Sequence, residues 1–471
     1  MANDADLFAQ NKFGDAESSP QSPQSPQDEN APSSEDRMLE ARRVALSLLE
    51  HVLGQKQQLD ASIEKSAGFA ALDSRDKAFV RMVVGTTLRR LGEIDDLIGK
   101  CEERPGSVSG NLSLQNILRM GIVQIIYMDV PDHAAVDTSV RLAEDARMSG
   151  KKGFVNGVLR KIIRDYPAMM SRQDPARLNT PEWLLKTWIA DYGLRIAADI
   201  ATANLSEAPL DISLKDQSTL IHWAERLEAR ALPSGSLRRA SGGGNITGLP
   251  GFHEGLWWVQ DASAAIPAQL FGDVEGKTVV DLCAAPGGKT AQLAAMGAQV
   301  LAVDRSTQRM KRLRENMQRL GLEERVEVHI SDGAVWRPKS PVPFVLCDAP
   351  CSATGTIRRH PDVPHLKTPR DIDILTEVQQ RILRNAFAML EVGGILIYCT
   401  CSLQKSEGEA QIERFISENN NAIRAPINAD EIGGMKECVT EQGDLRILPF
   451  MQSAYGGMDG FFVARLKKIG Q

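Results

Sequence analysis

The chain has 471 residues, of which 42% are hydrophobic and 25% charged, an ordinary composition for a globular protein of several domains. No apolar run approaches the roughly 18 residues that span a membrane, and the acidic N-terminus lacks the apolar core of a secretory signal. The seven cysteines form no C-x-x-C pair, which argues against a zinc site, and their odd number argues against a disulfide framework. We therefore expect a cytoplasmic protein without a metal.

The net charge of −6 comes from the N-terminal segment, because residues 1–36 hold eight acids and one lysine. This segment is rich in Ser, Pro and Gln, cannot bury enough apolar surface to fold, and is predicted to be a disordered tail. Residues 37–172 carry 21 basic and 17 acidic residues. This small excess fits a polyanionic partner, but on charge alone solvated helix faces are the better interpretation.

Residues 37–172 are predicted to be all-helical, because apolar residues recur at helical spacing through several segments. The stretches VPDHAAVDTSVRLA and KKGFVNGVLRKI, with the order of the helices, resemble the helical RNA-binding domain of the antitermination factor NusB. The resemblance covers nearly all of this region and implies RNA contact. The residues expected to make that contact are basic: Lys151, Lys152, Arg160, Lys161 and Arg164.

Residues 173–260 mix a helical stretch, PEWLLKTWIADYG, with a β-like stretch, PLDISLK, and predict a small α+β connecting subdomain. From residue 261 to residue 471 the pattern changes to alternating strands and helices. The strands are TVVDLC, QVLAVD, VEVHI, FVLCD and GILIYCTC, and the final stretch YGGMDGFFVARLKK is read as a strand added antiparallel to an edge. This alternation predicts an α/β, Rossmann-like domain with its ligand at the carboxyl ends of the strands.

The segment TVVDLCAAPGGKT joins the first of these strands to a helix and is rich in small residues. Pro286, Gly287 and Gly288 let a ligand approach the backbone, and the helix N-terminus that follows favours a carboxylate. The spacing fits neither G-x-G-x-x-G nor the P-loop, so NAD and ATP are less favoured ligands. Asp304 ends the second strand, where an acid can accept both ribose hydroxyls. Asp332 follows the third strand, where the edge of an adenine would lie. Another nucleotide-binding enzyme could carry the same acids.

Two cysteine motifs follow the fourth and fifth predicted strands: D-A-P-C ends at Cys351 and Y-C-T-C ends at Cys401. Neighbouring strands lie roughly 4.8 Å apart, so we expect the two thiols side by side above the cofactor edge. Cys347 lies inside the fourth strand and is predicted to be buried packing. Cys399 shares a strand face with Cys401, which makes it a second, less favoured candidate thiol.

The motifs D-A-P-C and T-C-S resemble the Nol/Nop/Sun family of RNA cytosine-C5 methyltransferases over residues 250–466. The resemblance implies S-adenosyl-L-methionine as cofactor, with Cys401 as nucleophile and Cys351 assisting product release. DNA cytosine methyltransferases use the P-C cysteine instead. The NusB-like region narrows the resemblance to the bacterial type that methylates 16S rRNA. The implied catalytic residues are Cys401, Cys351 and Asp348, and the implied cofactor residues are Cys283, Ala284, Ala285, Pro286, Gly287, Gly288, Lys289, Asp304, Asp332 and Asp348.

The implied chemistry needs a thiolate because carbon 5 of cytosine is a poor nucleophile. Addition at carbon 6 makes the ring an enamine that can attack a methyl group, and elimination then frees the enzyme. The base must be flipped out or single-stranded.

Arg358 and Arg359, which follow the P-C motif, are predicted to contact the RNA backbone, with salt-bridged surface as the alternative. Two other functions remain open: the same chemistry on tRNA, and a non-enzymatic RNA-binding assembly factor. The chain is expected to act as a monomer.

Overall fold

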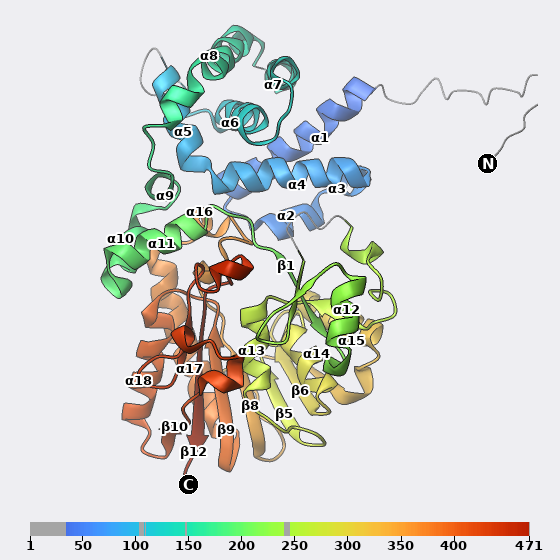
Figure 1. Cartoon of the computed structure of the whole chain (residues 1–471), viewed down its shortest axis with the longest axis vertical. Helices are drawn as coiled ribbons and strands as arrows, with labels where there is room; N and C mark the ends of the chain where they lie inside the picture. The colour runs from blue at the N-terminus through green and yellow to red at the C-terminus, as the bar shows by residue number, and fades with distance from the viewer. Residues whose placement is uncertain (1–33, 103–107, 109, 147, 240–244, 471) are drawn as a thin grey trace, which may run out of the picture.

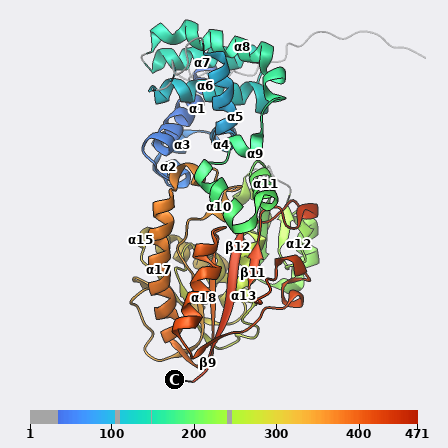
Figure 2. The ribbon, with the colours of Figure 1, turned by 90° about the vertical axis from the view of Figure 1, so that its left-hand side faces the viewer.

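The computed structural model describes residues 34–102, 108, 110–146, 148–239 and 245–470. Most of the predicted tail, residues 1–33, lies outside the described residues, and the first helix begins at Ser34, just before the expected boundary. Figures 1 and 2 show a helical part stacked on a larger part built around a sheet, with short helices between them.

The helical part agrees with the predicted all-helical region. Its α-helices pack around α6, which is hydrophobic nearly all round and contacts α4, α7 and α8. Asn111 caps α6 by accepting a hydrogen bond from the Leu114 backbone N–H at 2.9 Å. The helices are α1 (Ser34–Leu49), α2 (Leu59–Lys65), α3 (Ala67–Ala71), α4 (Ser74–Arg89), α5 (Leu91–Cys101), α6 (Leu112–Tyr127), α7 (Asp132–Asp145) and α8 (Lys152–Met170).

The connecting region begins with three helices and continues into a small antiparallel sheet of order β2-β3-β1-β4. The predicted β-like stretch PLDISLK contains β1. Trp188, Trp257 and Trp258 are buried, as tryptophans in a small core are expected to be. The elements are α9 (Pro175–Leu178), α10 (Glu182–Tyr192), α11 (Leu194–Ala203), β1 (Leu210–Leu214), α12 (Leu220–Arg226), β2 (Arg230–Ala231), β3 (Leu237–Arg239) and β4 (Trp257–Val259).

The large sheet has the order β10-β12-β9-β8-β5-β6-β7, with β11 paired to β12. Neighbouring strands from β7 to β9 are parallel, as the alternating pattern predicted, and β12 pairs antiparallel with β9. β12 is not at an edge, because β10 and β11 also pair with it. The strands are β5 (Thr278–Leu282), β6 (Gln299–Asp304), β7 (Val326–Ile330), β8 (Val342–Asp348), β9 (Leu390–Thr400), β10 (Ala422–Arg424), β11 (Leu445–Ile447) and β12 (Phe461–Lys468).

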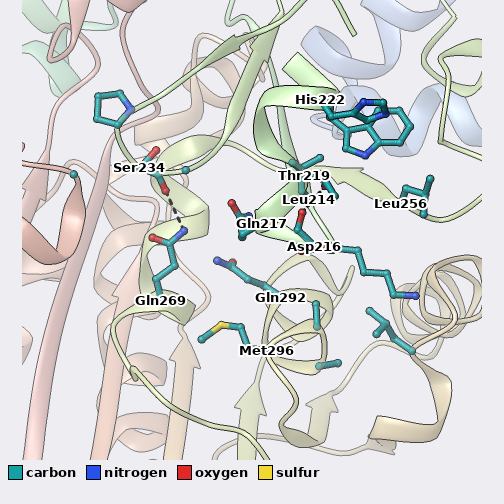
Figure 3. Close-up of a pocket in the computed structure, with 18 of the residues that line it drawn as sticks. Leu214, Asp216, Gln217, Thr219, His222, Ser234, Leu256, Gln269, Gln292 and Met296 are labelled. Carbon is teal, nitrogen blue, oxygen red and sulfur yellow. Dashed lines mark hydrogen bonds between the residues drawn. The ribbon is translucent and has the colours of Figure 1, made fainter. Parts of the chain in front are cut away.

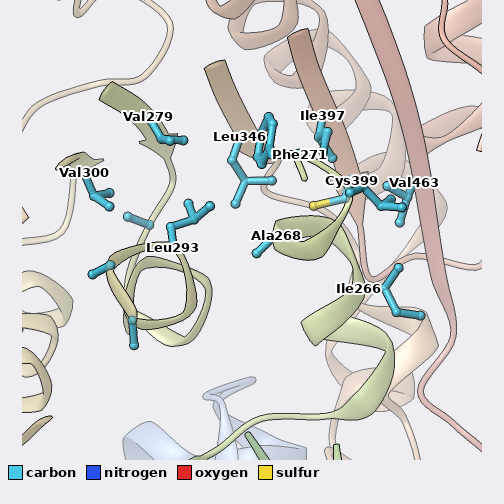
Figure 4. Packing of buried hydrophobic residues seen from close by; sticks show 14 of the residues in the cluster. Ile266, Ala268, Phe271, Val279, Leu293, Val300, Leu346, Ile397, Cys399 and Val463 are labelled. Carbon is cyan, nitrogen blue, oxygen red and sulfur yellow. The ribbon is translucent and has the colours of Figure 1, made fainter. Parts of the chain in front are cut away.

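Helices cover both faces of this sheet, and successive strand residues point to opposite faces. Val279, Leu293 and Ile266 belong to one hydrophobic cluster on the first face, which Figure 4 shows from close by. Val280 packs with Ile382 on the other face. The first face is covered by α13 (Ala262–Gln269), α14 (Gly288–Ala295) and α15 (Thr307–Leu320), and the second by α17 (Pro369–Ala388) and α18 (Glu409–Glu418).

A buried ion pair ties the small sheet to the large one. Asp211 in β1 is 0% exposed and accepts two hydrogen bonds from Arg238 at 2.6 Å. The same carboxylate accepts the Ala262 N–H at the start of α13, at 3.0 Å. Arg238 also donates to the carbonyl oxygens of Tyr455 and Gly457. The pair therefore holds three segments that are distant in the sequence.

Replacing Asp211 with alanine should lower the free energy of unfolding by about 3–5 kcal/mol, because the buried guanidinium of Arg238 would lose its counter-charge. The double variant Asp211→Ala/Arg238→Met should recover part of this loss, since the buried charge is then gone. Urea unfolding of both variants measures the effect. Glu182→Ala, which breaks an exposed ion pair with Lys186, is the control and should leave stability nearly unchanged. A single variant as stable as the control would contradict the prediction.

Candidate active site

The two cysteine motifs meet at the carboxyl ends of β8 and β9. We call the segment after β8 the P-C loop (349–360) and the segment after β9 the T-C-S loop (401–408). The Sγ atoms of Cys351 and Cys401 lie 3.5 Å apart, and both residues are half-buried. The predicted side-by-side placement of the two thiols is therefore confirmed.

The four thiols around this point differ in their surroundings. The hydrogen bond with Cys401, together with burial, raises the pKa of the Cys351 thiol well above its ordinary value. Cys399 is 0% exposed, and burial followed by the charge of Asp348 raises its pKa. Cys347 is fully buried, as predicted. Cys351 and Cys401 are thus the two thiols with access to a substrate.

Lys289 brings a positive charge to the same place. Its Nζ donates to Asp348 Oδ2 at 2.8 Å, and only 10% of its side chain is exposed. Burial disfavours the charged amine, but the charge of Asp348 and the hydrogen bond to it outweigh burial and raise the pKa of Lys289 overall. A lysine held in its charged form favours negative charge on a neighbouring thiol.

The loop from Cys283 to Lys289 turns sharply between β5 and α14. Gly287 has a φ of +104°, and a Cβ at this position would lie 3.0 Å from Leu313 Cγ, so the turn requires glycine. Arg309, in α15, donates to the carbonyl oxygen of Ala285. The loop therefore presents backbone at the start of α14, as the sequence predicted.

Asp304 and Asp332 lie at the edge of this loop. Asp304 is 4% exposed, and its Oδ2 lies 3.4 Å from the Ala285 nitrogen. Asp332 is exposed, and its Oδ1 accepts the Ala334 N–H at 2.9 Å. Ser331 joins the two acids, because its N–H donates to the Asp304 carbonyl at 3.1 Å. The structure thus brings together the loop and both predicted strand-end acids.

Sequence reasoning missed Glu407, which lies in the T-C-S loop and is 0% exposed. Its carboxylate accepts hydrogen bonds from the hydroxyls of Ser352 and Ser402, each at 2.5 Å. These serines directly follow Cys351 and Cys401. Both loops carry a Cys-Ser pair, which the sequence shows. No local pattern shows that Glu407, five residues after Ser402, folds back to contact both serines.

The prediction that Arg358 contacts RNA is wrong, because its side chain is enclosed by protein. Arg358 is 4% exposed and donates to the Gly456 carbonyl at 2.7 Å. Arg359 is committed to two buried carboxylates, with its Nη2 2.9 Å from Asp261 Oδ2 and its Nε 3.1 Å from Asp459 Oδ2. The salt-bridged alternative therefore describes Arg359. A pair of basic residues looks the same in a sequence whether it faces solvent or anchors a loop.

The five basic residues predicted to bind RNA lie on and before α8, but they do not form one patch. Lys152 and Arg160 line a groove of about 730 Å³ between α7 and α8. Lys161 donates to the Lys100 carbonyl at 3.2 Å, toward the end of α5. Arg164 is 69% exposed and pairs with Asp165, and Lys151 is exposed. Two of the five therefore share a groove.

A cavity of about 1280 Å³ lies between the small sheet and α14 (Figure 3). Gln217, Gln269 and Gln292 point into it, but none of the predicted catalytic or cofactor residues lines it.

Within the described segments, no group of three His, Cys, Asp or Glu side chains is placed to hold a metal ion. In the same segments, no helix combines the length and apolar character that crossing a membrane requires.

The fold and the site together define a class of protein. A Rossmann-like sheet, a glycine-rich loop after β5 and acids at successive strand ends are the features of an S-adenosylmethionine-dependent methyltransferase.

Comparisons with known proteins agree. Residues 268–467 match the family described as 16S rRNA methyltransferase RsmB/F, and residues 39–164 match the NusB family. A Synechocystis protein, described as a probable ribosomal RNA small subunit methyltransferase B, is 34% identical over 92% of this chain and 100% of its own length. This chain belongs to the ribosomal RNA small subunit methyltransferase B family. It is an enzyme, and its cofactor is S-adenosylmethionine.

Solved structures share the fold. The crystal structure of PH0851 gives a TM-score of 0.71 at 22% identity, over 91% of this chain and 99% of that chain. The crystal structure of NSun6 from Pyrococcus horikoshii with SFG gives a TM-score of 0.52 at 18% identity, over 62% of this chain and 99% of that chain. The first of these likenesses spans both the helical part and the sheet.

Asp281 in β5 should make stability depend on pH. It is 0% exposed, and burial, partly opposed by a hydrogen bond from Thr290, raises its pKa from 3.8 to about 7. The folded state therefore favours the protonated acid, and this stabilisation is lost as the pH rises toward and through about 7. Asp281→Asn mimics the protonated form at every pH. Its melting temperature relative to wild type should rise between about pH 4 and about pH 7 and then level off. A difference that is the same at every pH would contradict this assignment.

Proposed function

We propose that this enzyme transfers a methyl group to carbon 5 of a cytosine in small-subunit (16S) rRNA, with Cys401 as the covalent nucleophile. The observation that carries the proposal is the pair of thiols 3.5 Å apart at the carboxyl edge of the sheet. The names of the relatives support the rRNA substrate. The cytosine chemistry rests on the thiol pair, because methylation at carbon 5 requires covalent activation of the ring.

The two thiols take different roles. Cys401 adds as a thiolate to carbon 6 of the flipped cytosine, forming a sulfur–carbon bond and leaving carbon 5 as an enamine. Carbon 5 then attacks the methyl group that S-adenosylmethionine would supply, and the methyl–sulfur bond would break to leave S-adenosylhomocysteine. Loss of the proton from carbon 5 drives elimination, which breaks the bond to Cys401 and restores aromaticity. Cys351 lies 3.5 Å from this sulfur, and the raised pKa of its thiol favours a role in release rather than attack.

Asp348 and Lys289 supply the electrostatics of the site. The pKa of Lys289 is raised, so the residue supplies a positive charge at the site. Asp348 has one oxygen held by Lys289, and 31% of its side chain is exposed. An acceptor that is oriented but still accessible can bind the amino edge of the cytosine. This pair therefore serves both the nucleophile and the base.

The residues of the cofactor loop fit S-adenosylmethionine, which supplies an electrophilic methyl group when bound. The backbone of Cys283 to Lys289 leads into the start of α14, where a carboxylate is favoured. The buried carboxylate of Asp304 can accept ribose hydroxyls, and Asp332 lies further along the same edge, where the adenine would be. Asp348, at the end of β8, would be a further residue that holds the cofactor.

The NusB-like part, residues 37–172, is proposed to bind rRNA through phosphates. The likeness to NusB supports this role, and Lys152 and Arg160 line the groove between α7 and α8. The same chemistry on tRNA is the alternative, which bisulfite sequencing of rRNA and tRNA from cells with and without the gene would separate. We further propose that the enzyme works as a monomer, without a metal, in the cytoplasm, since one chain supplies all the residues of the site.

The two cysteines should fail in different ways. Cys401→Ala should abolish both methylation and any covalent adduct. Cys351→Ala should permit attack and methyl transfer but slow release, so a covalent RNA–protein complex should accumulate. The double variant should lose the complex again. Denaturing electrophoresis with labelled rRNA detects the adduct. Adducts from Cys401→Ala and none from Cys351→Ala would reverse the assignment.

Removing the charges of Lys152 and Arg160 should weaken rRNA binding. Each neutralised phosphate contributes roughly 0.7 to 0.9 to the slope of affinity against salt, so the double alanine variant should lower that slope by up to about 2. Filter binding at several salt concentrations measures it. Lys186→Ala, an exposed lysine on α10, is the matched control and should leave the slope unchanged. An unchanged slope in the double variant would mean that the groove does not contact phosphate.

A further inference from the structure

Glu407 is a buried carboxylate that bonds to both cysteine loops. Its Oε2 accepts from the hydroxyls of Ser352 and Ser402, each at 2.5 Å. Its Oε1 accepts from the Ser352 backbone N–H at 2.9 Å and from Gln379 Nε2 at 3.0 Å. All three of these residues are 0% exposed. A single side chain therefore joins the residues that follow Cys351 and Cys401.

The chemistry of the contacts requires an acceptor at this position. The four groups around the carboxylate are two hydroxyls, a backbone N–H and an amide, and all four can donate. These donors are neutral, so the contacts do not form an ion pair. A charge buried without a counter-charge is unfavourable unless it is fully hydrogen-bonded. The carboxylate of Glu407 therefore has all of its hydrogen bonds only when both the P-C loop and the T-C-S loop are in place.

Further contacts hold the same residues in register. Glu407 is fixed to β9 through its own backbone, because its carbonyl accepts from Tyr398 Oη at 3.0 Å. Gln379, on α17, also donates to the Pro350 carbonyl at 2.9 Å, directly before Cys351. The Cys401 carbonyl accepts the Gly355 N–H at 2.9 Å, which joins the loops above the carboxylate. The position of each sulfur therefore depends on the position of the other loop.

We propose that Glu407 is the positioning residue that sets the two cysteines relative to one another, so that attack by Cys401 and release assisted by Cys351 occur on the same base. The inference rests on the proposed function and adds to it a residue that does not contact the substrate. Covalent catalysis is sensitive to such placement, since a displacement of about 1 Å can lower a rate about 100-fold.

The test uses the full-length enzyme and small-subunit rRNA transcribed with 5-fluorocytidine, in which the fluorine prevents elimination and traps the adduct. Glu407→Ala should form the adduct about 100-fold more slowly than wild type while binding S-adenosylmethionine with unchanged affinity. Glu407→Gln should recover most of the rate, because its amide can accept at one atom and donate to the rotatable hydroxyls at the other. Glu413→Ala, which changes an exposed glutamate of α18, is the matched control. A wild-type adduct rate in Glu407→Ala overturns the inference.

Two serine variants give an independent readout that a purely structural role would not produce. Ser402→Ala should slow adduct formation, because it loosens the loop of the nucleophile. Ser352→Ala should form the adduct at the normal rate but release methylated, unfluorinated rRNA about tenfold more slowly, because it loosens the loop of Cys351. These variants decide the question if Glu407→Ala does not bind the cofactor, and identical behaviour of the two overturns the inference. Failure of the wild-type enzyme to form any adduct would instead reject the proposed function.

Discussion

The parallel pairing of β8 and β9 is the constraint on which the site depends. In this register Asp348 lies opposite Cys399, so both strands end at the same edge of the sheet. The two chains leave the sheet together, and the P-C and T-C-S loops bring Cys351 and Cys401 to 3.5 Å. A shift of one residue would turn every side chain of one strand to the other face and separate the thiols. The hydrophobic packing on both faces of the sheet therefore also fixes the catalytic geometry.

Beyond the ends of β8 and β9 the two chains are no longer paired as strands, and buried polar side chains position the loops instead. Lys289 pairs with Asp348, and Glu407 joins the two serines next to the cysteines. The first contact is an ion pair, and in the proposed mechanism it acts on the thiolate and the base. The second is enclosed and bonded to neutral donors, and we propose that it acts on geometry.

The sequence predicted the features that local patterns encode. Alternation of apolar runs predicted the strands from β5 to β9, and the position of each cysteine after a strand predicted the thiol pair, because parallel strands end at one edge. Arg358 was misread because its burial depends on the C-terminal segment around Gly456, about 100 residues away, which no local pattern reveals. Glu407 was missed for the same reason, since its partner Gln379 comes from a distant helix. The cofactor, RNA and catalytic roles of individual residues remain predictions.

The segment that begins at Arg358 also joins the two parts of the molecule. Its backbone carbonyl accepts a hydrogen bond from Arg89 of α4 at 2.9 Å. A few residues further on, Asp362 accepts the Leu59 N–H at 2.9 Å, and His365 bonds to the Leu88 carbonyl at 2.9 Å. The chain that leaves the P-C loop thus becomes the surface on which the NusB-like part rests. Each of these contacts joins a side chain to a backbone group, and Asp362 and His365 supply two of the three side chains, so the contacts depend on the residues of the segment as well as on its path. The NusB-like part and the loop of Cys351 are therefore joined by one continuous segment.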